Sequence, residues 1–453
     1  MKLERTQEFE KAIAMMDEDI PFLFITGRAG TGKSTLLRQY ILASKRRVPV
    51  LAPTGVAALN VGGETIHRFF RFSPTVTVKD AKREGRMSED KLYRVIDSII
   101  IDEISMVRAD LLDCVDAFLR AARQNQKPFG GVRIVAIGDL YQLPPVVTKF
   151  DKEGFFKLYA TPYFFSSRVV QELLDYGQFE FFELQKVYRQ KDKKFLGFLN
   201  GIRDLTINDE GLAGLNKRLR KGRNVDDTIV LTPTNQAADD LNECRLAELS
   251  GKAHLFEGQL SGDFHERDAP AGRDLRLKKG ARVMCTVNDS AEAYVNGSLG
   301  WVKGFEDDGV LVELDEGGTA RIEKHTWNLY RSHYDFFSDS LEQEKIGSFT
   351  QYPLRLAWAI TIHKSQGKTF DKVVIDLGRG AFAAGQVYVA LSRCRSLEGL
   401  ILTKPVTLRQ VMLDPAIVDF LAELRGEKKK RRNLFDILFV DKPVEPVYVE
   451  DEG

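Results

Sequence analysis

One segment, GRAGTGKS at residues 27–34, restricts the possible folds of this chain more than any other feature. It fits the pattern G-x-x-x-x-G-K-[ST], in which glycines let the backbone wrap a phosphate chain and point its N–H groups at the oxygens. An apolar run at residues 22–25 precedes the segment, and a helix-forming run at 35–42 follows it. A phosphate-binding loop between a buried strand and a helix is therefore predicted, and it indicates an α/β fold.

Three further apolar runs in the first 180 residues share the character of the run before the loop. Each is short and nearly unbroken, as is typical of strands buried on both faces of a parallel sheet. They lie at residues 48–51, 99–101 and 134–137. Polar or glycine-rich residues follow each run, and α/β sheets carry their functional residues at the carboxyl ends of the strands.

A second α/β pattern begins near residue 180 and contains an apolar strand at 228–231. Between about 274 and 339, short strands alternate with tight turns, which predicts a small β-barrel. The barrel strands are predicted at residues 282–287, 300–305, 310–314 and 319–323. A polar, basic segment at 73–91 interrupts the first α/β region. The sequence therefore indicates two α/β domains that each carry an insertion.

Charge, cysteine content and hydropathy limit the remaining possibilities. The 453 residues include 66 Lys and Arg against 65 Asp and Glu, so any surface that binds nucleic acid must be local. The four cysteines form no metal-ligand pair, which favours a reducing compartment and a core role. No apolar stretch approaches the ~20 residues of a membrane span, and no signal sequence is visible. We expect a soluble intracellular protein.

A second acidic segment completes the expected nucleotide site. In SIIIDE, residues 98–103, a buried strand ends in two carboxylates. We expect Asp102 to hold Mg²⁺ and Glu103 to position or deprotonate the attacking water. A strand that simply ends in two solvated acids is the alternative, and the phosphate loop favours the catalytic interpretation. Gln142 could hydrogen-bond the γ-phosphate, although its segment alone is structural.

Taken together, these motifs resemble those of superfamily 1 helicases, specifically the petite-integration-frequency (PIF) branch of superfamily 1B. They occur in the family's order from Gln7 to Arg393, so the resemblance covers most of the chain. The matching segments are APTGVAA (52–58), GETIHRFF (63–70), DEISM (102–106), KPFGG (127–131), GDLYQLPP (138–145), VYRQ (187–190), AWAITIHKSQG (357–367) and YVALSR (388–393).

The resemblance implies that the chain uses ATP and Mg²⁺ through individual residues. Gln7 would read the adenine edge, and Tyr188 would stack on the base. Arg189 and Arg393 would reach the γ-phosphate from the second domain as arginine fingers. The expected catalytic residues are Lys33, Glu103, Gln142, Arg189 and Arg393. The expected nucleotide ligands are Gln7, Gly27, Gly30, Thr31, Gly32, Lys33, Ser34, Thr35, Tyr188 and Gly367. The expected metal ligands are Ser34 and Asp102.

The same resemblance implies a path for single-stranded DNA. Hydroxyls, imidazoles and one lysine would contact phosphates without reading the base sequence, and Phe69 or Phe70 would stack on a base. Because adjacent residues of a helix point about 100° apart, one of these two rings is expected in the core. The expected DNA contacts are Pro53, Thr54, Gly55, His67, Phe70, Thr361, His363 and Lys364.

The implied fold is α/β, with two RecA-like P-loop domains that contain parallel sheets. The first domain would carry a small wedge insertion, and the second a β-barrel insertion that resembles a Src-homology-3 fold. The expected boundaries are 1–70 and 92–180 for the first domain, 71–91 for the wedge, 181–273 and 340–432 for the second domain, 274–339 for the barrel, and 433–453 for a C-terminal tail.

The expected activity is ATP-driven 5′-to-3′ movement on single-stranded DNA. Tailed or forked duplexes would be unwound, with RNA–DNA hybrids or G-quadruplexes as further substrates in repair, recombination and telomere maintenance. The larger family members have a long N-terminal extension that this sequence lacks, which favours a compact bacterial type that is cytoplasmic and associated with the nucleoid. We also expect the protein to act as a monomer on DNA and to have no membrane partner. Two other classes are an ATP-switched DNA clamp and an ATPase that remodels proteins. Glu103 and the two arginines argue against the clamp, and the DNA motifs argue against the remodeller.

Overall fold

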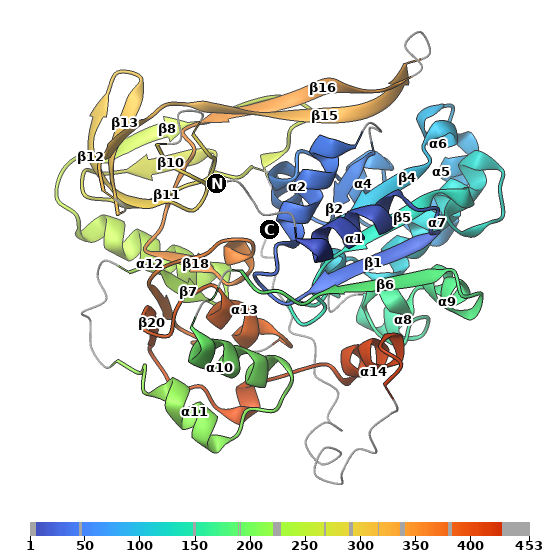
Figure 1. Cartoon of the computed structure of the whole chain (residues 1–453). Coiled ribbons are helices and arrows are strands. Elements are labelled where there is room, and N and C mark those ends of the chain that lie inside the picture. Colours follow the sequence, from blue (N-terminus) through green and yellow to red (C-terminus); the bar gives the residue numbers. More distant parts are fainter. Residues whose placement is uncertain are drawn as a thin grey trace. The chain divides into compact units, whose positions relative to one another are not determined.

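The computed structural model describes residues 6–44, 48–147, 151–188, 190, 192–220, 228–266, 269–289, 293–315, 317–335, 340–378 and 383–427. The chain groups into two compact units. The first comprises residues 1–188, 330–344 and 414–453, and the second comprises 189–329 and 345–413. Each unit contains a parallel sheet with helices around it (Figure 1), so the predicted α/β class is confirmed.

The first unit is built on a six-stranded sheet in the order β3-β2-β4-β5-β1-β6, and all neighbouring strands run parallel. Its strands are β1 (Phe22–Gly27), β2 (Val50–Ala52), β3 (Glu64–Thr65), β4 (Ser98–Ile101), β5 (Arg133–Ile137) and β6 (Phe179–Leu184). The four apolar runs predicted as strands overlap β1, β2, β4 and β5, which confirms these strands, although β2 begins two residues after the predicted start at 48.

Helices cover this sheet and form the insertion. They are α1 (Gln7–Asp17), α2 (Lys33–Ala43), α3 (Gly55–Asn60), α4 (Ile66–Phe69), α5 (Val78–Met87), α6 (Leu92–Val95), α7 (Ala109–Arg123), α8 (Lys152–Phe156), α9 (Arg168–Asp175) and α14 (Pro415–Leu424), with 3-10 turns η1 (Ile104–Met106), η2 (Pro128–Gly131) and η3 (Phe164–Ser166). The polar, basic segment at 73–91 contains α5, which packs along α7.

Strand β1 is buried along its whole length. Because side chains alternate between the two faces of a strand, Leu23 and Ile25 join a cluster with residues of α1 and α2. Phe22 and Phe24 occupy the alternate positions, and the Phe24 ring lies 5.1 Å from that of Phe164. Burial on both faces explains why this segment of the sequence is an unbroken apolar run. It also gives the loop that follows β1 a rigid base.

Two elements that the sequence placed in the second domain group with the first unit. Strand β6 pairs in parallel with β1 along its whole length. Helix α14 packs on the same unit, where the rings of Phe420 and Phe165 stack at 4.2 Å. Arg425, just after α14, donates to Glu183 of β6 from Nε at 2.9 Å and from Nη2 at 2.7 Å. Both elements lie far from β1 along the chain, so a pattern read in sequence order does not reveal these partners.

The second unit contains a four-stranded parallel sheet in the order β18-β7-β19-β20. Its strands are β7 (Val230–Thr232), β18 (Ala359–Thr361), β19 (Val373–Ile375) and β20 (Leu400–Leu402). Its helices are α10 (Lys193–Arg203), α11 (Asp209–Asn216), α12 (Asn235–Glu248) and α13 (Gln386–Ser392), with 3-10 turns η5 (His363–Ser365) and η6 (Leu408–Gln410). The strand predicted at 228–231 overlaps β7.

The region of predicted short strands forms a five-stranded sheet in the order β14-β13-β12-β11-β17, with antiparallel neighbours. Its strands are β11 (Arg282–Cys285), β12 (Leu299–Glu306), β13 (Gly309–Leu314), β14 (Thr319–Ile322) and β17 (Leu354–Leu356). The four strands predicted between 282 and 323 are therefore confirmed. Alternate residues such as Val283, Val302 and Val312 form a buried apolar cluster.

Further strands in this part of the chain were not predicted. They are β8 (His254–Glu257), β9 (Gln259–Gly262), β10 (Asp274–Leu277), β15 (His325–Asp335) and β16 (Ser340–Gln351). Strand β10 pairs with β8, and β15, β16 and β9 form a three-stranded sheet. Many positions of β15 and β16 are polar or charged. Their sequence therefore lacks the clear apolar alternation that indicates a half-buried strand.

The cysteines are unpaired. Cys114, Cys285 and Cys394 are buried, which agrees with the predicted core role, whereas Cys244 is exposed. None of the helices among the described residues has both the length and the hydrophobicity that crossing a bilayer requires.

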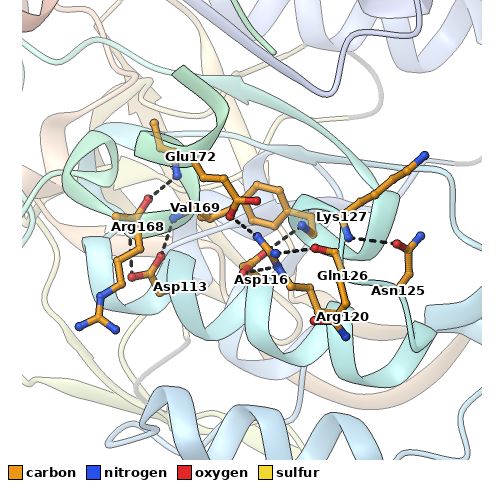
Figure 2. A network of polar contacts seen from close by, with 12 residues as sticks. Asp113, Asp116, Arg120, Asn125, Gln126, Lys127, Arg168, Val169 and Glu172 are labelled. Atoms are coloured by element: carbon orange, nitrogen blue, oxygen red, sulfur yellow. Dashed lines mark hydrogen bonds and ion pairs between the residues drawn. The ribbon is translucent and has the colours of Figure 1, made fainter. Parts of the chain in front are cut away.

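A polar network around α7 fixes the turn that leads into β5 (Figure 2). The Asp116 carboxylate accepts a hydrogen bond from the backbone N–H of Phe129 at 2.6 Å and forms an ion pair with Arg120 at 2.8 Å. Arg120 in turn pairs with Glu172 of α9 at 2.6 Å. Phe129 has a φ of 51° and Gly130 a φ of 62°. Non-glycine residues rarely adopt this left-handed conformation, so Asp116 stabilises a turn that has little preference of its own.

Replacing Asp116 with Ala should lower the free energy of unfolding by about 1.5–3 kcal/mol, because a largely buried charged acceptor is removed from two donors. The matched control is Glu153→Ala. Glu153 also forms a four-residue-spaced ion pair, with Lys157 at 2.7 Å, but the two side chains are 85% and 69% exposed. Chemical denaturation should show a change within about 0.5 kcal/mol for this control. Similar losses in both variants would contradict a special role for Asp116.

Candidate functional site

Many of the nucleotide residues predicted in the first unit lie at one edge of its sheet. Because its strands run parallel, their carboxyl ends meet at the same edge. The phosphate loop follows β1, Pro53 and Thr54 follow β2, and Asp102 and Glu103 follow β4. The segment that contains Gln142 follows β5. The sheet topology therefore brings together segments that are separated by more than 100 residues in the sequence.

The backbone of the phosphate loop requires glycine at two positions. Gly30 has a φ of 85° and Gly32 a φ of 87°. A Cβ atom on Gly32 would lie 2.9 Å from the Phe9 ring, so a larger residue would also clash. The loop is held by two further bonds, from Thr31 Oγ1 to the Arg28 carbonyl at 2.9 Å and from the Tyr188 N–H to the Gly30 carbonyl at 2.8 Å.

Lys33 begins α2 and folds back over the loop. Its Nζ donates to the carbonyls of Gly27 at 2.7 Å and Arg28 at 3.3 Å, so the cation sits inside the curve of the loop. Ser34 is exposed and Thr35 is half-buried in the first turn of the helix. A helix N-terminus offers unpaired N–H groups and the positive end of its dipole. This arrangement can bind a phosphate chain.

The two carboxylates after β4 differ in environment. Asp102 is 8% exposed, and burial, together with the nearby charge of Glu103, raises the pKa of its carboxyl to about 7. Glu103 is half-buried and adopts a φ of 51° and a ψ of 42°. Such a conformation is strained in a residue other than glycine and is often found at functional sites. The strain sets Glu103 apart from an ordinary solvated acid at a strand end.

The oxygen ligands at this edge suit Mg²⁺. Mg²⁺ prefers hard oxygen ligands and is usually held by one or two carboxylates, waters and the phosphates of a substrate. Asp102 and Ser34 supply a carboxylate and a hydroxyl of this kind. No group of three or more His, Cys, Asp and Glu that could hold a metal alone occurs in the described ranges. The residues therefore fit a cation that arrives with a nucleotide.

Gln142 is buried beside a buried acid. Its Nε2 donates to Asp139 Oδ2 at 3.1 Å, and the backbone N–H of Tyr141 donates to Asp139 Oδ1 at 3.2 Å. Asp139 is fully buried and Gln142 is 8% exposed. Asp139 therefore orients the Gln142 side chain, a role that the sequence did not predict.

The start of α1 lies beside the phosphate loop. Tyr188 Oη donates to Thr6 Oγ1 at 3.4 Å, and the Tyr188 ring meets that of Phe9 edge-on at 6.1 Å. Gln7 is exposed at the first helical position, and Tyr188 is 39% exposed. The structure thus brings together the two residues expected at the base. Phe9 was missed by the sequence analysis, although an aromatic residue two positions after Gln7 was visible.

The first-unit residues expected to bind DNA are exposed or half-buried, except for Phe70. Thr54 is exposed and its hydroxyl accepts from the N–H of Ala57 at 3.3 Å, which caps α3. Pro53, Gly55 and His67 are half-buried. Phe70 was expected to stack on a base, but it is 1% exposed.

Phe70 belongs to an aromatic cluster. Its ring lies 4.9 Å from Phe69, 5.3 Å from Phe72 and 5.3 Å from Phe118. Phe69 is also buried, at 4% exposed. The expectation that one of the two adjacent rings is in the core was too narrow, because both are. Phe70 therefore packs the insertion against α7, and its assignment as a DNA contact was wrong for this structure.

In the second unit, the expected DNA contacts lie at the end of β18 and just after it. Thr361 is the last residue of the strand and is buried, at 4% exposed. Lys364 is exposed, and its N–H donates to Thr361 Oγ1 at 3.2 Å. His363 is half-buried, and burial lowers the pKa of its imidazole, which favours a neutral ring at pH 7. Gly367 has a φ of 76° with open space around its Cβ position, so the backbone itself calls for glycine there.

The two expected arginine fingers have different outcomes. Arg189 lies outside the described residues. Arg393 is 1% exposed and donates from Nε to the Val389 carbonyl at 3.0 Å, and from Nη1 to the carbonyls of Ser365 and Lys368 at 3.4 Å. In this structure the guanidinium therefore joins the end of α13 to the turn at η5. Arg395 is exposed and pairs with Asp371 at 2.8 Å.

The two units share a short sequence pattern that the sequence analysis did not use. The pattern Pro-Thr-x-x-Ala-Ala occurs at 53–58 and again at 233–238. Thr234 follows β7 as Thr54 follows β2, and each hydroxyl caps the next helix from 3.3 Å, to Ala237 in one unit and Ala57 in the other. The two units therefore present the same type of corner after a parallel strand.

Comparisons with known proteins agree with these observations. A family model described as PIF1-like helicase matches residues 2–211. The human ATP-dependent DNA helicase PIF1 is 38% identical over 429 residues, which cover 89% of this chain and 61% of the human protein. This chain thus spans about three fifths of that relative's length. The Bdellovibrio bacteriovorus ATP-dependent DNA helicase Pif1 is 32% identical, with 89% of both chains covered.

A solved structure shows the same likeness in three dimensions. The crystal structure of Bacteroides sp Pif1 in complex with ADP-AlF4 matches with a TM-score of 0.84 and 36% identity, over 94% of this chain and 98% of the Bacteroides chain.

The site generates a prediction for Glu103. Glu103→Gln should retain binding of Mg-ATP but turn it over about 10²–10⁴ times more slowly, since general-base assistance is typically of that size. Lys33→Ala is the companion variant and should abolish turnover, because the cation over the phosphates is removed. Nucleotide affinity and single-turnover rate should be measured separately. Loss of affinity in Glu103→Gln with a normal rate for bound ATP would make Glu103 a structural residue.

Proposed function

The chain belongs to the PIF1-like helicase family, and we propose that it is an ATP-dependent DNA helicase that moves 5′-to-3′ on single-stranded DNA. One observation carries the proposal: a single parallel-sheet edge presents the phosphate loop, a buried Asp102 and the strained Glu103. A site that only binds nucleotide needs no second carboxylate in a strained conformation. The arrangement therefore supports hydrolysis.

The nucleotide is proposed to bind along this edge. Backbone N–H groups of Gly30 to Ser34 would surround the phosphates, with Lys33 between the β- and γ-phosphates. Ser34 and Asp102 would hold Mg²⁺, which neutralises phosphate charge. Glu103 would accept a proton from the attacking water, and Gln142, oriented by Asp139, would sense the γ-phosphate. The exposed Gln7 and Tyr188 would contact the base.

Coupling to movement is proposed to depend on the second unit. Arg189 and Arg393 would stabilise the transferring phosphoryl group when the two units close. For Arg393 this requires release from the carbonyls of Ser365 and Lys368, which belong to the turn after the DNA-binding segment 361–364. Release of Arg393 would therefore remove the hydrogen bonds that two carbonyls of that turn accept from it. Closure on ATP and opening after hydrolysis would advance one strand between the units.

DNA is proposed to follow the corners that the two units share. Thr54 and Thr234 each follow a parallel strand and cap a helix, so each presents hydroxyl and N–H groups that suit phosphates. Thr361, the half-buried His363 and the exposed Lys364 would add contacts in the second unit, with Pro53, Gly55 and His67 in the first. Such contacts carry no base information, which fits a motor that must move along any sequence.

The proposal also includes action as a monomer on tailed or forked duplexes and a role in genome maintenance in the bacterial cytoplasm. The expected domain boundaries are kept, except that β6 and α14 are assigned to the first domain, with which they group. RNA–DNA hybrids and G-quadruplexes are proposed as further substrates.

Tailed duplexes provide the decisive test. We expect single-stranded DNA to stimulate ATP turnover, and a duplex with a 5′ tail to be opened while one with only a 3′ tail is not. Strand separation and ATP turnover should be measured in one preparation. Efficient opening of the 3′-tailed duplex would contradict the polarity. ATP-dependent binding without turnover would indicate a clamp, and turnover that ignores DNA would indicate a protein remodeller.

Arg393 and Arg395 form a matched pair for the second unit. Arg393→Ala should lower kcat by about 10³ or more, the size typical of arginine fingers, with little change in DNA affinity. Arg395→Ala should change kcat only slightly, because Arg395 makes an exposed ion pair. Thermal denaturation of both variants separates loss of chemistry from loss of folding. Equal effects on kcat would show that the finger is misassigned.

A further inference from the structure

Lys368 joins two parts of the second unit that lie far apart in the sequence. Its backbone belongs to the turn after η5, where its N–H donates to the Ser365 carbonyl at 3.0 Å and its carbonyl accepts from Arg393 Nη1 at 3.4 Å. Its side chain leaves this turn, and Nζ donates to Asn296 Oδ1. Asn296 lies 72 residues earlier, in the segment 293–298 that leads into β12 of the five-stranded sheet. We call this segment the β12 loop.

The β12 loop is held together by its own hydrogen bonds. The Val295 N–H donates to Ser298 Oγ at 3.0 Å, and the Ser298 N–H donates back to the Val295 carbonyl at 2.9 Å. The Gly297 N–H donates to the Cys285 carbonyl of β11 at 2.9 Å. A Cβ atom on Gly297 would lie 4.0 Å from Cγ of Lys368, so the stem of this lysine passes beside the loop. Lys368 therefore contacts a segment that can respond as a unit.

The Lys368 ammonium group is half-buried without a carboxylate beside it. Among the described residues, no acidic side chain lies within ion-pair distance of this group. Burial, together with the nearby charge of Arg355, lowers the pKa of Lys368 to about 8. Burying a cation that has no opposite charge is unfavourable, whereas an apolar side chain of similar length carries no such cost. Stability of the fold therefore does not require a cation here, and the contact with Asn296 is what the charged group adds.

We propose that Lys368 is a positioning residue that connects the turn held by Arg393 to the β12 loop, so that ATP turnover is coupled to strand separation through this lysine. Arg393 donates to the Lys368 carbonyl, and the Lys368 side chain donates to Asn296, so a displacement of the turn reaches the loop through one residue. The proposal rests on the helicase function and on the role of Arg393 proposed above.

The test removes the ammonium group and leaves the backbone of the turn in place. Lys368→Met keeps an unbranched side chain but cannot donate to Asn296. The matched control is Lys372→Met, which removes an exposed lysine four residues further along the same unit. For each full-length variant, four quantities are measured: affinity for single-stranded DNA, ATP turnover stimulated by that DNA, strand separation of a 5′-tailed duplex, and thermal denaturation.

For Lys368→Met, the number of strands separated per ATP hydrolysed should fall about 10-fold, the size by which a hydrogen bond to a charged group shifts an equilibrium. Turnover on single-stranded DNA should stay close to that of the unaltered chain. The melting temperature should not fall, because an unpaired cation is removed from a half-buried position. The control should change none of these quantities. A loss of stability, a loss of affinity for the single strand, or equal falls in turnover and strand separation would each overturn the proposal.

Amide hydrogen exchange gives a readout that a purely structural residue would not change. Mg-ADP with aluminium fluoride, which mimics the transferring phosphoryl group, should alter exchange in the β12 loop of the unaltered chain bound to a single strand. The same response is expected in Lys372→Met and should be lost in Lys368→Met. A response that persists in Lys368→Met, or that is absent from the unaltered chain, would overturn the proposal. If single-stranded DNA does not stimulate ATP turnover by the unaltered chain, the helicase proposal itself fails, which is a different result.

Discussion

The parallel hydrogen-bonded ladder that joins β1 to β5 and β6 is the constraint on which the rest of the first unit depends. Strand β1 is buried on both faces and paired on both edges, so its end is fixed in three dimensions. The phosphate loop follows directly from that end. A left-handed loop whose glycines have φ near 85° has little stability of its own. It is held because β1 cannot shift without breaking two ladders and the apolar packing of both faces.

The same sheet edge contains two residues whose burial or backbone conformation is unfavourable in free energy. Asp102 is buried with a pKa raised to about 7, and Glu103 adopts a strained left-handed conformation. Buried carboxyls and strained residues persist only where the surrounding structure fixes them. Here β4 lies between β2 and β5 in the sheet. A bound cation would offset the burial of Asp102, which is consistent with a nucleotide site at this edge.

The second unit repeats the strand-end arrangement but not the phosphate loop. The Pro-Thr-x-x-Ala-Ala corner occurs once in each unit, whereas the GKS sequence of the phosphate loop follows β1 alone. Two units with similar corners and a single phosphate loop agree with the proposed motor, in which one unit would cleave ATP and both would hold a strand. The Arg393 guanidinium donates to carbonyls of the turn that follows the expected DNA contacts. In the proposed function Arg393 would also stabilise the γ-phosphate, so the proposal couples nucleotide and DNA through one side chain.

The sequence by itself determined the features that depend on local chemistry. GRAGTGKS predicted the loop because glycine is needed wherever φ is positive, and the apolar runs predicted β1, β2, β4 and β5 because strands buried on both faces admit little else. Turn residues predicted the short strands from β11 to β14. The tertiary structure decided what depends on distant partners. Strand β6 and α14 joined the first unit because their apolar surfaces fit β1 and Phe165. Phe70 lies in the core and not on the expected DNA surface, because Phe72, Tyr93 and Phe118 enclose its ring. Arg393 is buried because its guanidinium donates hydrogen bonds to the carbonyls of Ser365 and Lys368, which lie nearly 30 residues earlier in the chain. Periodicity reports which face of an element is apolar, but only packing selects the element that covers it.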